Sequence, residues 1–303
     1  MLNFCFRNTL LSTRNITASL KIIAMWLLFV CTSVHAEALL QILPTRIVLD
    51  DSTRLTSLTL VNQGDEDTSY RMFFRNIRMS ETGQFNILTE EDDVSEEKFA
   101  DNMLRFSPRR ITIPARGKQT IRIVARKPPG LEKGEYRSHM VFRRLPPQTS
   151  VLDQAENPEL KLAIRPVVEV TIPVIVRHES PDAEVTLSDI QLTKDTEYNP
   201  NTNSEELKTV INVAINREGD RSLYGDLDIH WTPKDGEKVK IGEANGISVY
   251  YPNKKRIFGL PLQLHNIDEN SEPLNLSNGK LSATFEENPI YGGDQSSSIT
   301  IVR

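Results

Sequence analysis

The histidines and cysteines of this chain are too scattered to suggest metal or thiol chemistry. After residue 36 no two histidines have the i, i+4 spacing of a metal site. Cys5 and Cys31 both precede residue 37, so we expect no thiol nucleophile and no disulfide beyond that point. G-x-S-x-G, P-loop and G-x-G-x-x-G motifs are missing from the sequence. We therefore expect a binding protein with no metal and no cofactor, rather than an enzyme. The histidines concerned are His139, His178, His230 and His265.

Arg46 is the first candidate binding residue. It follows Pro44-Thr45 and precedes the alternating run 47–49. Two interpretations are open. Composition favours a solvated charge at a strand end, whereas a buried or cleft position would make the guanidinium a fork of donors for a carboxylate.

The second candidate is the apolar run 160–176, in which one side of a two-residue period is almost wholly apolar. Pro166 and Pro173 within it favour an edge strand, because proline has no N–H for a ladder. One interpretation is a core strand interrupted by bulges. The other is an edge that pairs with a partner and places alternate side chains in its groove. The apolar side comprises Leu160, Leu162, Ile164, Val168, Val170 and Ile172.

The third candidate is the polar segment 216–222, with the sequence N-R-E-G-D-R-S. It lies between two predicted strands. We interpret it as a hairpin loop.

Apolar and polar residues alternate along most of the chain, with turn-forming residues between the alternating runs. This pattern predicts an all-β fold built from sandwiches. We expect the acidic segment 90–98 to be a solvated loop or single turn, 145–159 to be an extended loop, and 195–206 to be a polar loop. The segment 177–182 is expected to link two domains.

The N-terminus has the pattern of a secretory signal. Basic residues precede an apolar run at 22–31, and the small-residue site Val34-His35-Ala36 follows it. A run of this length is too short for a permanent membrane span, and lipoprotein processing at Cys31 is the other, less favoured alternative. We predict cleavage after Ala36.

The predicted mature part, residues 37–303, is acidic and long enough for two domains. The leader holds three of the 36 basic residues and none of the 41 acidic ones, so the mature formal charge is −8. This charge argues against a nucleic-acid partner. We predict a signal peptide at 1–36 and domains at 37–178 and 179–303.

Several segments together resemble the PapD-like periplasmic chaperones of chaperone–usher pilus systems, in a divergent branch. They span most of the mature chain. They are P-T-R-I-V-L at 44–49, L-T-L-V-N-Q-G at 58–64, F-S-P-R-R-I-T-I-P-A-R-G-K-Q-T-I-R-I at 106–123, G-E-Y-R-S-H-M-V-F at 134–142, V-T-I-P-V-I-V-R at 170–177 and N-R-E-G-D-R-S-L-Y-G-D-L at 216–227.

The resemblance implies two immunoglobulin-like β-sandwiches in an L- or boomerang-like arrangement. It also implies a cleft that holds a pilus or fimbrial subunit, donor-strand complementation by the run 160–176, and delivery to an outer-membrane usher. The donor-strand residues would be Leu162, Ile164, Val168, Val170 and Ile172.

Arg46 matches the family's cleft arginine, which anchors the subunit's terminal carboxylate. The family's second anchor is a lysine on the donor strand, and this chain has no lysine between Arg165 and Arg177. Lys161, Arg165 and Arg177 are the candidates for that role, with Arg177 preferred. The leading hypothesis is a periplasmic, ATP-independent chaperone without catalysis. The alternatives are an immunoglobulin-like binding or adhesion module and, third, an enzyme.

Overall fold

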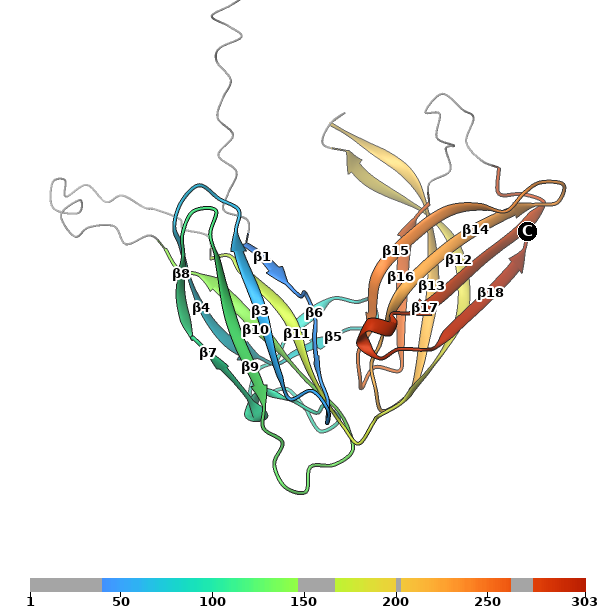
Figure 1. Ribbon diagram of the computed structural model, residues 1–303. Helices are drawn as coiled ribbons and strands as arrows, with labels where there is room; N and C mark the ends of the chain where they lie inside the picture. Colours follow the sequence, from blue (N-terminus) through green and yellow to red (C-terminus); the bar gives the residue numbers. More distant parts are fainter. Residues whose placement is uncertain (1–39, 147–166, 200–202, 263–274) are drawn as a thin grey trace, which may run out of the picture.

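The computed structural model describes residues 40–146, 167–199, 203–262 and 275–303. The predicted signal peptide lies outside these residues. The described chain forms two immunoglobulin-like β-sandwiches, inclined to one another and joined at the link that follows β11 (Figure 1). This confirms the predicted all-β fold. Within the described residues, no helix is long and apolar enough to cross a bilayer.

The first sandwich consists of a four-stranded sheet with the order β1-β3-β9-β7 and a five-stranded sheet with the order β2-β11-β10-β4-β8. Alternating burial along β3 and β9 directs one face of each strand into the core. The bounds are β1 Leu40–Leu43, β2 Ile47–Leu49, β3 Leu55–Asn62, β4 Thr68–Arg75, η1 Asp101–Met103, β7 Leu104–Ser107, β8 Arg110–Ile113, β9 Lys118–Ala125, β10 Gly134–Arg144 and β11 Glu169–His178.

The first strand of this sandwich is split between the two sheets. β1 pairs antiparallel with β3, whereas β2 pairs parallel with β11 in the opposite sheet. The chain crosses from one sheet to the other through a bend at 44–46. This crossover takes Arg46 out of both ladders and frees its side chain to leave the sandwich.

The second sandwich consists of a three-stranded sheet with the order β12-β13-β16 and a four-stranded sheet with the order β15-β14-β17-β18. β14 shows strict alternation of buried and half-buried residues along most of its length. The bounds are β12 Ala183–Asn199, β13 Ser204–Gly219, β14 Leu223–Pro233, β15 Val239–Val249, β16 Lys255–Pro261, β17 Gly279–Glu287, η3 Pro289–Tyr291 and β18 Ser296–Val302.

Each sandwich has its own apolar core. The buried residues of the first core run from Ile42 to Val176, and those of the second run from Ala183 to Phe285. The domain boundary after residue 178 stays a prediction. β11 ends at His178 and β12 begins at Ala183, so the segment between these two strands is four residues long.

Two local predictions in the second domain are wrong. Most of the segment 195–206 is not a loop, because β12 and β13 continue as a hairpin arm with Asn199 paired to Ser204. The segment 216–222 is not a hairpin loop either. Residues 216–219 are the end of β13, and residues 220–222 connect it to β14, which lies in a different sheet.

A small hairpin of the first domain reaches the second. It consists of β5 Ile77–Met79 and β6 Phe85–Ile87. The backbone N–H of Ile257 donates to the carbonyl of Glu81 in its turn at 2.7 Å. The Asn253 side chain donates to the carbonyl of Met79 at 2.5 Å. The two domains are therefore held together by this hairpin as well as by the link.

Candidate functional site

Arg46 lies between the two domains. Its side chain is 2% exposed, so the interpretation as a solvated strand-end charge is wrong. Nη1 donates to the hydroxyls of Ser248 and Tyr250, at 3.2 Å each, and both residues belong to the second domain. The first strand of one sandwich thus places a cation against the other sandwich.

Tyrosine rings of the second domain surround this guanidinium. The Arg46 Cζ atom is 4.4 Å from the ring centroid of Tyr224, 5.3 Å from that of Tyr250 and 5.9 Å from that of Tyr291. Aromatic faces attract a cation and favour retention of its charge in a desolvated position.

Two of the three guanidinium nitrogens have no acceptor. Nε and Nη2 of Arg46 are buried and make no hydrogen bond to any residue that the structure describes. Aromatic contacts do not supply the oxygen lone pairs that these N–H groups lose on leaving water, and a buried donor without an acceptor costs about 1–3 kcal/mol. Arg46 is thus held ready for an acceptor that the described part of the chain does not provide.

The Arg46 side chain lines a pocket of about 290 Å³ between the domains. The pocket wall includes two arginines, hydroxyl groups and aromatic rings, and none of the residues that line it is acidic. Such a lining favours a small anionic group such as a carboxylate. The lining residues are Thr45, Arg46, Met79, Gly83, Phe85, Pro173, Tyr224, Gly246, Ser248, Tyr250 and Arg256.

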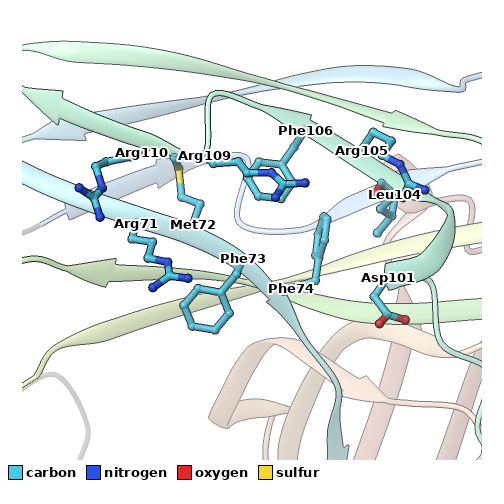
Figure 2. Close-up of a pocket in the computed structure, with 10 residues that line it drawn as sticks. All are labelled: Arg71, Met72, Phe73, Phe74, Asp101, Leu104, Arg105, Phe106, Arg109 and Arg110. Atoms are coloured by element: carbon cyan, nitrogen blue, oxygen red, sulfur yellow. Dashed lines mark hydrogen bonds between the residues drawn. The ribbon is translucent and has the colours of Figure 1, made fainter.

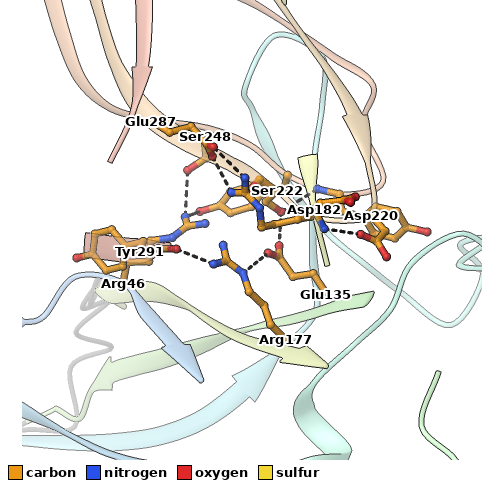
Figure 3. Close-up of polar contacts among 12 residues, drawn as sticks. Arg46, Glu135, Arg177, Asp182, Asp220, Ser222, Ser248, Glu287 and Tyr291 are labelled. Atoms are coloured by element: carbon orange, nitrogen blue, oxygen red, sulfur yellow. Dashed lines mark hydrogen bonds and ion pairs between the residues drawn. The ribbon is translucent and has the colours of Figure 1, made fainter. Parts of the chain in front are cut away.

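Arg177 lies beside Arg46 in an ion network at the link between the domains, called the hinge network below (Figure 3). Its Nε donates to Glu135 at 3.1 Å, and its Nη1 donates to the carbonyl of Tyr291 at 2.6 Å. Ser222 of the second domain donates its hydroxyl hydrogen bond to the same Glu135 carboxylate. Arg177 is therefore engaged within the protein and is not among the lining residues of the pocket, and its preferred role as second anchor stays a prediction.

Charge compensation in this network is close to complete. Burial raises the pKa of Glu135, but the charge of Arg177 and the hydrogen bond from Ser222 lower it by more. The pKa of this carboxyl therefore lies below its ordinary value of 4.5. Arg221 forms a bidentate pair with Glu287 at 2.7 and 2.9 Å. Arg217 donates to four backbone carbonyls, and the segment 216–222 therefore has a structural role.

Strand β11 has one free edge in the part of the chain that the structure describes. Residues 174–176 pair with β2 on one side, whereas 169–173 pair only with β10. Arg144 donates to the carbonyl of Val168, so alternation directs the backbone groups of Glu169, Thr171 and Pro173 away from β10. This explains why Pro173 is tolerated, because its missing N–H would not have served the ladder with β10.

The apolar face of β11 packs into the core of its own domain. Ile172 is 3% exposed and belongs to the core of the first domain, so the prediction that it enters a partner's groove is wrong. Val170 packs against the same core, whereas Val168 is 45% exposed. The other predicted donor-strand residues, Leu162 and Ile164, lie outside the described residues, as do the anchor candidates Lys161 and Arg165.

A larger pocket lies elsewhere and contains none of the predicted site residues. It measures about 700 Å³ and opens beside β4, η1, β7 and the turn before β8 in the first domain (Figure 2). Its four arginines are exposed, and the buried unpartnered atom in its lining is Oδ1 of Asp101, an acceptor. Exposed arginines satisfy their donors with water, so this pocket shows no comparable demand for a ligand. The arginines are Arg71, Arg105, Arg109 and Arg110.

Several residues of the site were missed at the level of sequence. Glu135, Tyr250 and Arg256 lie in segments that looked like ordinary strands and turns. They come together only through the packing of one domain on the other. Among the described residues, no group of three or more histidine, cysteine or acidic side chains is placed to hold a metal ion.

Comparisons with known proteins found similarity at the level of solved structures. Searches of protein-family models and of curated proteins found no match. The CupB2 chaperone of Pseudomonas aeruginosa is 12% identical, with 86% of this chain and 99% of that chain covered and a TM-score of 0.42. For the CsuC–CsuE chaperone–tip adhesion subunit complex of Acinetobacter baumannii the values are 12%, 87%, 98% and 0.41. For the E. coli chaperone DraB they are 12%, 88%, 99% and 0.40.

Proposed function

We propose that this chain is a periplasmic chaperone that binds pilus or fimbrial subunits between its two domains and delivers them to an outer-membrane usher. It acts after removal of the signal at 1–36, without ATP and without catalysis. The observation that carries the proposal is the burial of Arg46 with two unpartnered nitrogens at the interdomain pocket.

A buried guanidinium with two unpartnered nitrogens is a cost to the client-free protein. A terminal carboxylate would accept two parallel hydrogen bonds from Nε and Nη2, which is the bidentate geometry that arginine favours. Tyr250 and Ser248 add hydroxyl groups at the same pocket. The pocket is therefore suited to the end of a polypeptide chain, and the C-terminus of a subunit is our proposed ligand.

The free edge of β11 supports the strand-donation part of the proposal. Glu169 and Thr171 present backbone N–H and C=O groups that no strand in the described part of the chain uses. A partner strand could add to them by β-augmentation, next to the pocket wall at Pro173. The exposed Val167 and Val168, rather than the buried Ile172, are the described apolar residues that would enter the partner's groove.

The proposal is tested by co-expressing candidate pilus subunits with the chain and purifying the complex. Arg46→Met removes the carboxylate fork and an unfavourable buried charge, so subunit recovery should fall at least about tenfold while the chain itself stays folded. Arg109→Met, at an exposed arginine of the larger pocket, is the matched control and should recover subunit like the wild type. Equal recovery with Arg46→Met would contradict the proposal.

The same experiment tests the edge of β11. Thr171→Pro removes one outward N–H without touching the ladder to β10, and Thr171→Ala keeps that N–H as the matched control. Loss of subunit with the proline variant alone supports strand donation. Equal recovery with both variants favours a binding module that uses the pocket but not the edge.

A further inference from the structure

Arg256 in β16 reaches the same pocket as Arg46 but comes from the other domain. Its Nη1 donates to the carbonyl of Ser248 at 2.8 Å, whereas Arg46 donates to the hydroxyl of that residue. The two guanidinium groups therefore bind two polar groups of one residue, the backbone carbonyl and the side-chain hydroxyl of Ser248. Both side chains line the 290 Å³ pocket.

The Arg256 guanidinium is held in place and has one nitrogen to spare. Its Cζ atom is 5.2 Å from the ring centroid of Phe258. Gly83, at the turn of the β5–β6 hairpin, packs so closely that a β-carbon there would lie 2.6 Å from Nη2. Nε of Arg256 is buried and has no hydrogen-bond partner among the residues that the structure describes. Arg256 thus repeats the main feature of Arg46, a positioned cation with an unused buried donor.

No acidic side chain compensates these two cations within the pocket wall. Glu135, whose pKa Arg46 helps to lower, is engaged by Arg177 and Ser222. Two guanidinium groups around a small desolvated space produce a positive potential that favours an anion with more than one acceptor oxygen. The chain leaves the positions for those oxygens open.

We propose that Arg256 is the second basic anchor, so that the client's terminal carboxylate is bound by one guanidinium from each domain. This inference rests on the proposed function and deepens it. On the β11 side the pocket wall is Pro173, which carries no charge, and the second cation is supplied by β16 instead. Client binding would then also fix the angle between the two sandwiches.

The test measures the affinity of the full chain for a subunit that co-purifies with the wild type. Arg256→Met should weaken binding about 10- to 100-fold, as expected for loss of a charge-assisted hydrogen bond. Lys254→Met is the matched control, because it removes an exposed charge two residues away, and it should bind like the wild type. Arg256→Lys should fall between, because it keeps the charge without the fork.

The outcomes separate the inference from the function. If Arg46→Met loses the subunit and Arg256→Met binds it like the wild type, this inference is overturned and the proposed function stands. If no candidate subunit co-purifies with the wild type, both are overturned. The arginine Nε–H signals in NMR spectra distinguish binding of the subunit by Arg256 from a purely structural role of this residue. Addition of subunit should shift the signals of both Arg46 and Arg256, and an unmoved Arg256 signal contradicts the inference.

Discussion

The hinge network and the interdomain pocket both contain buried arginines, yet these arginines are in opposite states. At the hinge, Arg177 has Glu135 and a backbone carbonyl, and Arg221 has both oxygens of Glu287. In the pocket, Arg46 keeps two buried nitrogens without an acceptor. The hinge is electrostatically complete, whereas the pocket is complete only with a ligand.

This difference teaches how to separate structural from functional arginines at one interface. Burial alone does not distinguish them, because Arg177 and Arg46 are both buried. The number of guanidinium N–H donors that have an acceptor does distinguish them. A paired arginine stabilises the client-free protein. An unpaired arginine gains its missing hydrogen bonds only when a partner binds, so these hydrogen bonds contribute to binding.

The largest expected effect is on the stability of the hinge. Arg177→Met leaves the Glu135 carboxylate buried without its partner, which should lower the free energy of unfolding by about 3–5 kcal/mol. Arg46→Met removes an unpaired charge and should leave that free energy unchanged or slightly raised. Denaturant unfolding of the client-free variants measures both. Similar destabilisation by the two substitutions would contradict the distinction between the regions.

A smaller effect separates the two regions by pH. Burial and the nearby charges of Arg137 and Arg46 lower the pKa of His139, beside the pocket residues Phe85 and Tyr250, to about 3. The unfolded state takes up this proton from pH 6.5 downward while the folded state does not, so stability falls as the pH falls. The loss should reach on the order of 2–3 kcal/mol by about pH 4.5.

His139→Phe should remove this loss, as measured by thermal or denaturant unfolding across the pH range. The hinge behaves differently, because the folded pKa of Glu135 lies below 4.5, so its contribution begins to fall only below that value. An unchanged pH profile in His139→Phe between pH 6.5 and about 4.5 would show that the pocket side is not the acid-sensitive region.

Sequence patterns predicted the all-β fold well because alternation is imposed locally by a half-buried strand. They failed at the arm of β12 and β13, where described side chains at 193–196 are exposed, so no apolar face marks the strands. A free edge on this strand was one of the two interpretations of the sequence, but the packing of its apolar face was not predicted. The Ile172 side chain packs into the core of its own domain. The sequence does not show which apolar face packs into the core and which one is available to a partner.

The candidate site was only partly predictable for a similar reason. Arg46 was found through the segment that resembles a known family, and its burial could not be derived from its neighbours. Its contacts Ser248 and Tyr250 lie more than 200 residues away along the chain. Arg256 carries no sequence signal of its own, because its role depends on how one sandwich packs against the other.

The most direct test of the central claim compares one subunit with two different ends. A subunit with a free C-terminal carboxylate and the same subunit with a C-terminal amide are bound to the wild-type chain and to Arg46→Met. We predict that the amide weakens binding to the wild type at least about tenfold and has little further effect on the variant. Equal affinity of the wild type for both subunits would contradict the assignment of the pocket as a carboxylate site.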